Sequence, residues 1–319
     1  MTILVTGGTG SFGYAFVRHM LAQPDCPDRL CILSRDEYKQ HLMAQHFSDG
    51  RLRFFLGDVR DAARLRLAFH GVGTVIHAAA LKQVPAGEYS PQEFVATNIF
   101  GSMNVLDAAR DVGASKVLLL STDKACSPVT HYGATKLCAE RLFTAANSLH
   151  GPVSASTRYG NIIDSRGSVI PLWRQMVSEG KAIQVTEPDS TRFHMTQQAA
   201  VALVLLALRE MQGGEVFIPK LKSYRLGDLA MVVTGQLGQI VGLRPAEKLH
   251  EVLVSHDEMR TARDFGNHIR LIPEIHPWRS NGGPEGVALA GYEYGSKHVV
   301  MSMAELQLAF ETDMVGVAA

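Results

Sequence analysis

Short apolar runs recur through the first half of the chain, with stretches of helical periodicity between them. Each run is apolar at consecutive positions, so both faces of the strand are expected to be covered, as in a parallel sheet. Alternation of such strands with helices predicts an α/β fold, a Rossmann-type doubly wound parallel sheet. The predicted strands cover residues 3–5, 30–33, 53–56, 75–76, 117–120 and 153–157.

The pattern loosens after about residue 161. We therefore expect a dinucleotide-binding Rossmann domain over residues 1–160 and a smaller, mainly substrate-binding domain over residues 161–319, with some segments free to return to the sheet. Helices are predicted over residues 168–179, 197–211, 225–237 and 302–310, strands over 182–185 and 215–219, and a loop over 280–286.

Composition narrows the range of partners. Lys plus Arg (31) equals Asp plus Glu (31), so no net field would draw the chain to a nucleic acid polymer or a membrane surface. No apolar run approaches the roughly 20 residues that span a bilayer, and the N-terminus turns polar at Thr6, so we expect a cytoplasmic protein. The four cysteines form no C-x-x-C pair, which argues against a structural disulfide or a metal site.

A Gly-x-x-Gly-x-x-Gly pattern follows the first predicted strand directly and opens a helix. Glycines at this spacing let backbone amides approach a pyrophosphate at the helix N-terminus, where the helix dipole favours anions. The alternative is an ordinary glycine-rich turn, but here strand, spacing and helix coincide. The loop residues predicted to bind a dinucleotide are Gly7, Thr9, Gly10, Ser11, Phe12 and Gly13.

The end of the second predicted strand bears on the choice of cofactor. An NAD enzyme places an acidic residue there for the ribose 2′-hydroxyl, whereas here Ser34 and Arg35 come first and Asp36 follows. Arg35 suits the 2′-phosphate of NADP, which we expect; a solvated Arg35 with Asp36 on the ribose of NAD is the alternative. Asp58 and Val59, after the third strand, are placed to meet the adenine ring, although Asp58 could instead cap the next helix.

Tyr132 and Lys136 are four positions apart in a predicted helix, so their side chains share one face. A cation beside a phenol lowers the phenol's pKa from about 10, which would suit Tyr132 to act as a base. Such pairs are common on surfaces. This pair, however, lies just past the fifth predicted strand, and open α/β sheets hold their ligands at the carboxyl ends of strands.

Thr122, Asp123 and Lys124 end the fifth predicted strand. A simple dehydrogenase or epimerase needs one base and one hydroxyl donor beside its cofactor, which Tyr132, Lys136 and Thr122 would supply. Asp123 and Lys124 then form a second acid/base pair, which suggests an elimination between two hydride steps. Consecutive strand side chains point to opposite faces, so both reach the site only if the chain turns on leaving the sheet; otherwise one is a salt-bridge partner.

Together these motifs resemble the inverting UDP-N-acetylglucosamine 4,6-dehydratases, members of the extended short-chain dehydrogenase/reductase family that serve polysaccharide biosynthesis. The resemblance runs from Thr2 to about Pro273 and returns weakly near residues 291–306. The stretches that carry it are residues 6–13, 34–37, 57–61, 77–82, 121–125, 132–137, 158–161, 165–168 and 247–251.

The resemblance implies an NADP-dependent hydro-lyase acting on a UDP-linked sugar. Tyr132, supported by Lys136 and Thr122, would take the proton of the sugar 4-hydroxyl while NADP⁺ takes the C4 hydride. Lys124 would then remove the C5 proton, Asp123 would protonate the departing 6-hydroxyl, and the hydride would return to C6. Lys124 must be neutral for this step, and we expect burial, the nicotinamide charge and Lys136 to lower its pKa.

The resemblance also assigns binding residues. In the cofactor site it adds Ala78, Ala79, Ala80, Lys82 and Asn98. In the nucleotide-sugar site it places Lys82, Asn161, Arg166, Ser168, Val169, Arg192, Arg244 and Glu247. Guanidinium forks suit a diphosphate, although each arginine could equally serve a salt bridge. Family members pair through helices beside the sheet, here residues 93–112 and 132–149, so a homo-oligomer is expected.

Five positions depart from the family pattern and bear on the identity of the sugar and the C5 configuration of the product. Gln83 replaces a usual His, Thr130 a usual Asn, Asp164 a usual Gly, His194 a usual bulky aromatic residue and Ala246 a usual Gly.

Two rival interpretations remain open. A nucleotide-sugar 4-epimerase or dehydrogenase on the same fold would not need the acid/base pair at 123–124. A non-catalytic NADP-sensing protein is the other, because a fold alone does not establish a function, and the two complete acid/base pairs argue against it.

Overall fold

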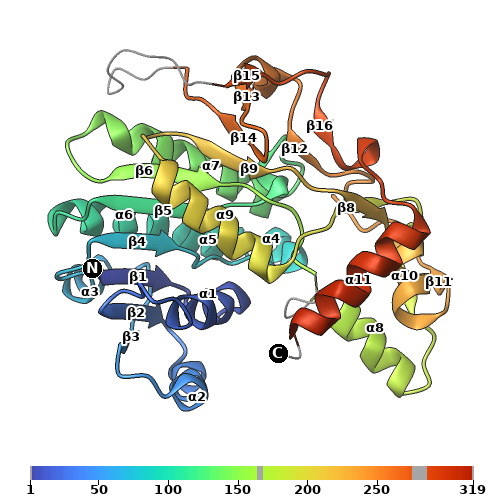
Figure 1. The fold of residues 1–319 in the computed structure, drawn as a ribbon, viewed down its shortest axis with the longest axis horizontal. Coiled ribbons are helices and arrows are strands. Elements are labelled where there is room, and N and C mark those ends of the chain that lie inside the picture. The colour runs from blue at the N-terminus through green and yellow to red at the C-terminus, as the bar shows by residue number, and fades with distance from the viewer. Residues whose placement is uncertain (1, 164–167, 275–285, 318–319) are drawn as a thin grey trace.

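The computed structural model describes residues 2–163, 168–274 and 286–317, and a ten-stranded sheet forms its centre (Figure 1). The first six strands are parallel and lie in the order β3-β2-β1-β4-β5-β6. The predicted doubly wound parallel sheet is therefore confirmed. The six strands are β1 (Thr2–Thr6), β2 (Arg29–Ser34), β3 (Leu52–Leu56), β4 (Thr74–His77), β5 (Lys116–Leu120) and β6 (Val153–Thr157).

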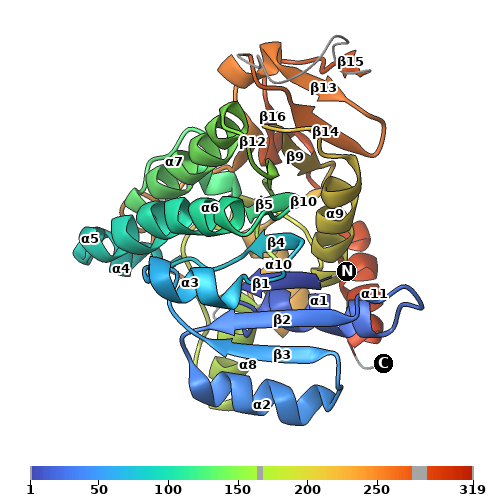
Figure 2. The same cartoon turned by 90° about the vertical axis from the view of Figure 1, so that its left-hand side faces the viewer.

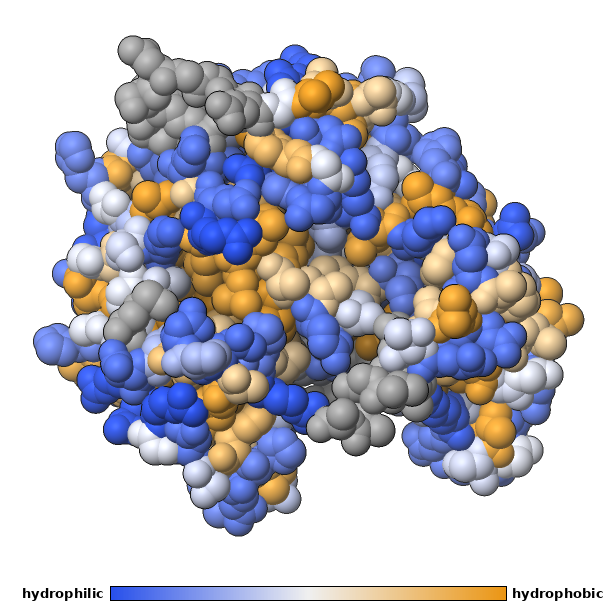
Figure 3. Space-filling view, viewed as in Figure 1, coloured by the Kyte–Doolittle hydropathy of each residue, from blue (hydrophilic) through white to orange (hydrophobic). Residues whose placement is uncertain are grey.

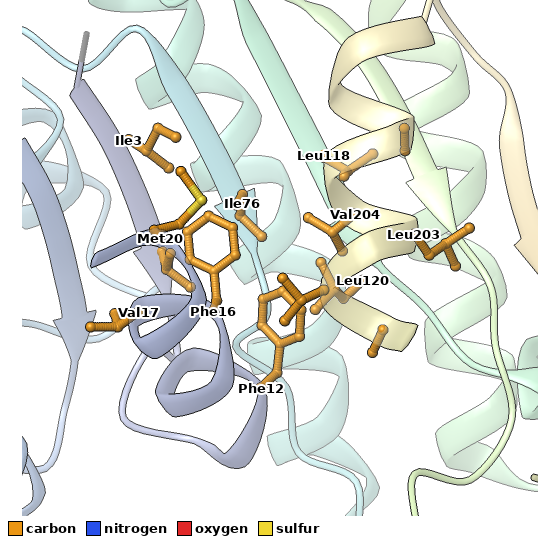
Figure 4. Packing of buried hydrophobic residues seen from close by; sticks show 14 of the residues in the cluster. Ile3, Phe12, Phe16, Val17, Met20, Ile76, Leu118, Leu120, Leu203 and Val204 are labelled. Carbon is orange, nitrogen blue, oxygen red and sulfur yellow. The ribbon is translucent and has the colours of Figure 1, made fainter. Parts of the chain in front are cut away.

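Helices cover both faces of the sheet, which is why its strands are apolar at consecutive positions (Figure 2). Helices α1 and α9 lie against one face, and Figure 4 shows their side chains Phe16 and Val204 pointing at Ile76 and Leu118 of the strands. Helices α3, α6 and α7 cover the other face. The bounds are α1 (Ser11–Leu21), α2 (Glu37–Phe47), α3 (Ala62–Ala68), α4 (Val84–Tyr89), α5 (Pro91–Phe94), a π-helix η1 (Val95–Phe100), α6 (Gly101–Asp111), α7 (His131–Ala145) and α9 (Gln197–Glu210).

The chain beyond residue 160 contributes to the sheet and also builds a separate lobe. Strand β9 is parallel to β6, and β14, β13 and β15 continue the sheet in antiparallel fashion; they are β9 (Val216–Pro219), β13 (Ala262–Asp264), β14 (His268–Leu271) and β15 (Val287–Ala288). The lobe packs around the buried Trp173 and Leu229. It contains α8 (Val169–Ser178), α10 (Leu226–Thr234), α11 (Met303–Val317), β7 (Gln184–Val185) and β11 (Gln239–Ile240). The domain boundary at residue 160 stays a prediction.

Short pairs of strands and 3₁₀ turns complete the described fold. They are β8 (Thr191–Phe193) with β10 (Ser223–Arg225), β12 (Val252–Val254) with β16 (Tyr294–Gly295), and the turns η2 (Asp123–Ala125), η3 (Ala146–Ser148), η4 (Asp257–Arg260) and η5 (Ser296–His298). The predicted loop at 280–286 lies outside the described residues except for its last position. Within the described ranges, no helix has both the length and the apolar character needed to cross a lipid bilayer.

Candidate active site

A cavity of about 740 Å³ opens where the parallel strands end. Parallel strands share one carboxyl edge, so the loops after β1, β2, β4, β5 and β6 converge there. Figure 3 shows the molecular surface notched between the part that carries α1 and α2 and the lobe that carries α8 and α11. All predicted cofactor residues line the cavity except Gly13 and Asn98, and all predicted catalytic residues do except Asp123. Of the predicted substrate residues, Lys82, Asn161 and Ser168 line it.

The glycine loop has the shape that a dinucleotide requires. Gly7 has φ of 65°, and a Cβ there would lie 2.7 Å from Cα of Ala79, so only glycine lets the two loops pass. A Cβ on Gly13 would lie 1.8 Å from the carbonyl oxygen of Gly8. Gly13 therefore allows the helix to pack closely on the loop, although it does not line the cavity. Gly10 is the N-cap of α1 and offers no side-chain cap, so the first amides of the helix can receive a phosphate. The loop therefore fits a nicotinamide dinucleotide.

At the end of the cavity predicted to hold the adenosine ribose, the two acidic residues Asp36 and Asp58 have different settings. Asp36 is the N-cap of α2: its carboxylate accepts from the Lys39 N–H at 3.0 Å and pairs with the Lys39 ammonium at 2.7 Å. Arg35 is exposed, and its Nη1 lies 3.8 Å from Oδ2 of Asp58. Asp58 does not cap the next helix, because Asp61 is the N-cap of α3. Two cationic side chains, Arg35 and Lys39, therefore line this part of the cavity, and Asp36 forms an ion pair with Lys39.

Tyr132 and Lys136 are both buried on α7 and line the cavity. Burial raises the pKa of Tyr132 to about 12, although the Lys124 charge and a hydrogen bond with Thr122 act in the opposite direction. The prediction that a neighbouring cation brings this pKa below its ordinary value is therefore wrong, because burial outweighs the charge. Burial lowers the pKa of Lys136 to about 8, and its ammonium donates to the Leu120 carbonyl at 2.8 Å.

Lys124 lies between two carboxylates. Its ammonium donates to Oδ1 of Asp123 at 3.1 Å, to Oε1 of Glu251 at 3.0 Å and to Oδ1 of Asn161 at 3.4 Å. The turn η2 lets the chain change direction as it leaves β5, so Asp123 and Lys124 reach one cluster, with the Thr122 hydroxyl 3.1 Å from Oδ1 of Asp123. Glu251 belongs to the stretch 247–251 that carries the family resemblance, but no local signal in the sequence predicts its contact with Lys124.

The prediction that the pKa of Lys124 is lowered is also wrong. Burial of the ammonium lowers this pKa, but the carboxylates of Asp123 and Glu251 raise it by more, so the net value lies above the ordinary one. For Asp123, burial raises the pKa, and the Lys124 charge only partly offsets this. Asp123 consequently keeps its proton to a higher pH than an ordinary aspartic acid, as a general acid must.

The predicted diphosphate residues form a network beside this cluster. Nη2 of Arg192 donates to Oε1 of Glu247 at 2.9 Å, and the backbone N–H of Arg244 donates to Oε2 of Glu247 at 3.1 Å. Nε of Arg192 also lies 4.0 Å from Oε1 of Glu251, which links the network to Lys124. The side chain of Arg244 is exposed. Arg192 is therefore held as a salt-bridge partner, at the edge of the catalytic cluster.

The other predicted binding residues lie in varied settings. The Asn98 amide donates to the Leu81 carbonyl and to Thr135, so this side chain braces the cofactor loop from behind. The Ser168 hydroxyl is buried and has no hydrogen-bond partner among the described residues, as expected of a group that meets a ligand. Val169 begins α8, and Arg166 lies outside the described residues.

The departures from the family pattern have distinct structural settings. Gln83 lines the cavity, and Thr130 caps the N-terminus of α7, which an Asn would do equally well. His194 packs edge-on against an aromatic ring. Ala246 has φ of 59°, a left-handed conformation that favours glycine. Asp164 lies outside the described residues.

Comparison with known sequences gives consistent matches over most of the chain. A family model described as "Polysaccharide biosynthesis protein" matches residues 3–273. A UDP-N-acetylglucosamine 4,6-dehydratase (inverting) from Campylobacter jejuni subsp. jejuni is 45% identical over 278 residues, which is 86% of this chain and 83% of that protein. A UDP-glucose 4-epimerase from Rickettsia canadensis is 41% identical over 280 residues, covering 85% of this chain and 82% of that protein.

Solved structures share the fold. Pen from Bacillus thuringiensis is 34% identical with a TM-score of 0.89, and the match covers 98% of both chains. DesIV, a dTDP-glucose 4,6-dehydratase from Streptomyces venezuelae solved with NAD bound, is 26% identical with a TM-score of 0.72, covering 78% of this chain and 87% of that one.

Proposed function

The chain belongs to the polysaccharide biosynthesis protein family, and from this we propose that it is a nucleotide-sugar 4,6-dehydratase, a hydro-lyase acting on UDP-N-acetylglucosamine with a nicotinamide cofactor. One observation supports an elimination most directly. Beside the Tyr132 and Lys136 pair, the cavity carries a second acid/base pair, because Asp123 and Lys124 share one cluster. Oxidation at C4 alone would leave that pair without a task.

The chemistry divides between the two pairs. When bound, the dinucleotide supplies the acceptor for the C4 hydride and its donor to C6. Tyr132, once ionised, takes the proton of the 4-hydroxyl; Thr122 hydrogen-bonds it, and Lys136 lies one helical turn away on α7. Lys124, once neutral, removes the C5 proton, and Asp123, whose pKa burial raises, gives its proton to the departing 6-hydroxyl. Water leaves, the hydride returns to C6, and a proton returns to C5, so no net oxidation occurs. We infer that this proton arrives on the face opposite to the one that lost it, which inverts C5.

We propose NADP as the preferred cofactor. Arg35 and Lys39 bring two positive charges to the ribose end of the cavity, and Asp36 is already occupied as a helix cap. A 2′-phosphate would be attracted to such a pair, whereas an NAD site needs a free carboxylate. Arg35→Glu is expected to reverse the preference, measured as the ratio of the two dissociation constants. Equal affinity of the wild type for NAD and NADP would contradict the proposal.

The nucleotide end of the substrate is proposed to meet Asn161, Ser168, Arg192 and Arg244. Glu247 binds the guanidinium of Arg192 and the backbone N–H of Arg244. Val169 and Arg166 flank this region in the sequence and belong to the same proposal. A diphosphate fits it because guanidinium groups bind phosphate oxygens in pairs.

A homo-oligomer in the cytoplasm completes the proposal. Tyr89, Phe100 and Met103 are exposed on the helices α4 to α6 and their π-helical link, which supports pairing through this side of the sheet. All four cysteines are free thiols, as is usual in a reducing compartment.

The experiment is turnover of UDP-N-acetylglucosamine in deuterated water, read by NMR. Tyr132→Phe should abolish cofactor reduction and C5 exchange together. Asp123→Asn should still wash deuterium into C5 but form 6-deoxy product about 10²–10⁴-fold more slowly, since the general acid is lost. Lys124→Ala should suppress C5 exchange while C4 oxidation continues.

The rival enzyme is a 4-epimerase, which the Rickettsia relative's name makes the natural alternative. An epimerase would return the hydride to C4 and leave C5 without solvent deuterium. A 4-epimer as sole product would therefore overturn the dehydratase proposal, and no turnover with tight NADP binding would favour a sensing protein.

A further inference from the structure

Glu251 stands at the catalytic cluster, 127 residues along the chain from Lys124. It is 3% exposed, and its Oε1 accepts from the Lys124 ammonium at 3.0 Å. Three partners surround that ammonium, which are Asp123, Glu251 and Asn161. An ammonium has three N–H donors, so each partner takes one and the amine is fixed in direction. Glu251 thus helps decide where the proposed C5 base points.

The backbone of Glu251 is held independently of Lys124. Its N–H donates to Oγ of Ser296 at 2.9 Å, and its carbonyl accepts from the Ser296 N–H at 2.8 Å. Ser296 is fully buried, and its hydroxyl also lies 2.6 Å from that of Thr191. Contacts with β8 and η5 therefore fix the position of the Glu251 carboxylate, and the Lys124 ammonium binds to a group that is already in place.

The second carboxylate oxygen argues against a purely structural ion pair. Oε2 of Glu251 and Oδ2 of Asp123 are both buried with no hydrogen-bond partner among the described residues. A carboxylate that served only to join two segments would be expected to have both oxygens satisfied, because an unsatisfied buried acceptor is costly. Unsatisfied buried acceptors on both sides of one ammonium are expected where protons move.

Charges on several elements act on Lys124 and Glu251. The groups that face Lys124 are Asp123 on η2, Glu251 before β12, Arg192 on β8, Tyr132 on α7 and Tyr224 on β10. Lys248 additionally faces Glu251. Burial raises the pKa of Glu251, but Lys124 and Arg192 lower it by more, so Glu251 stays an anion. Its charge also favours the protonated form of Asp123.

Resting on the proposed function, we propose that Glu251 is a positioning residue for the base that acts at C5: its carboxylate, held in place through Ser296, directs the Lys124 amine and keeps a negative charge beside it. Asp123 has a separate duty in the elimination, so Glu251 is the partner that remains an anion beside Lys124. Removing the negative charge of Glu251 should make Lys124 neutral at lower pH. Shortening the side chain of Glu251 should change the direction of the Lys124 amine.

The first test measures Lys124 itself and needs no turnover. The full-length protein is labelled with acetic anhydride at several fixed pH values, and Lys124 acetylation is followed by peptide mass spectrometry, with Lys82 in the same cavity as the reference for access. Only the neutral amine reacts. Glu251→Gln should label Lys124 at least about tenfold faster at a given pH, because an anion this close shifts a pKa by one unit or more. Glu251→Asp, which restores the charge, should label near the wild-type rate.

The second test follows C5 exchange against pH in deuterated water. In Glu251→Gln the rising limb of the profile should move to lower pH by about one unit or more while the maximum rate falls. Glu210→Gln is the control, because Glu210 is also a carboxylate in a salt bridge but pairs with Arg270 at the end of α9, outside the cavity. It should leave both the labelling rate and the limb unchanged, even if it is less stable.

The outcomes separate the two proposals. Wild-type labelling of Lys124 in Glu251→Gln overturns the inference whatever the enzyme's substrate. Faster labelling with an unmoved exchange limb shows that Lys124 is not the C5 base, which also overturns the positioning role. Faster labelling together with a wild type that forms no dehydrated product leaves the charge effect established and refutes the proposed function alone.

Discussion

Arg158 forms a buried ion-pair network whose loss should be large and dependent on pH. Its guanidinium, 1% exposed, donates to Glu140 and to both carboxylate oxygens of Glu258, at 2.9 Å each. Oε2 of Glu258 also accepts from the Ser255 N–H at 3.1 Å. The network joins the end of β6 and helix α7 to the turn η4. It therefore links the sheet to the segment that carries Glu251.

Glu258→Gln tests this network, and its magnitude follows from the structure. Burial raises the pKa of Glu258, but Arg158 and the hydrogen bonds lower it by more, to about 2 from an ordinary 4.5. Each pKa unit corresponds to about 1.4 kcal/mol, so the charged form contributes about 3 kcal/mol to folding at neutral pH. The amide that replaces the Glu258 carboxylate carries no charge, and its NH₂ group would face the Arg158 guanidinium where the wild type has an acceptor oxygen. We expect the free energy of unfolding to fall by about 3 kcal/mol at pH 7.

The sign of the pH dependence is fixed by the lowered pKa. A depressed carboxyl pKa gives stability that is fully present above the unfolded value and is lost as pH falls through the folded value. The difference between wild type and Glu258→Gln should hold from pH 7 to about 5. It should shrink as pH falls from about 4.5 to about 2, because the carboxyl takes up its proton first in the unfolded chain and only later in the folded one.

The assay is urea denaturation at a series of pH values, followed by tryptophan fluorescence, to which the fully buried Trp173 contributes. Glu179→Gln serves as control, because Glu179 pairs with Lys181 on the surface and should matter little. A loss below about 1 kcal/mol at pH 7, or a loss that stays constant down to pH 3, would refute the reasoning.

Three further predictions follow from backbone and surface geometry. Ala246→Gly should raise the free energy of unfolding by up to about 1 kcal/mol in the same assay, because relief of the left-handed φ of 59° outweighs the added chain entropy; a decrease would contradict this. Gly160→Ala should reduce both stability and product formation, since its Cβ would lie 2.6 Å from Cβ of Phe193; Gly50→Ala, with open space around it, is the control, and equal behaviour of the two would argue against this packing. Light scattering at micromolar protein should give a multiple of the chain mass that falls to one chain in Phe100→Asp; a monomeric wild type would rule out the oligomer.

The local motifs could be predicted from the sequence because their physics is local. Glycine spacing after an apolar strand predicted the dinucleotide loop, and the four-residue interval predicted that Tyr132 and Lys136 share a helix face, since both rest on distances along one short segment. Whether Asp123 and Lys124 meet depended on a turn after β5 that the sequence left open, and η2 provides it.

The chain alone therefore determined the parallel sheet, the loop and the residue types at the carboxyl ends of the strands. Tertiary structure decided what those residues experience. Glu251 reaches Lys124 from 127 residues away and raises its pKa, and burial, which depends on every layer packed around α7, raises the pKa of Tyr132 to about 12. The expected lowering of the Tyr132 pKa was wrong because burial outweighs the nearby cation, and that of Lys124 was wrong because two carboxylates outweigh burial. The free energy of an ionised group depends on its solvation and on charges brought close by folding, and the local sequence determines neither.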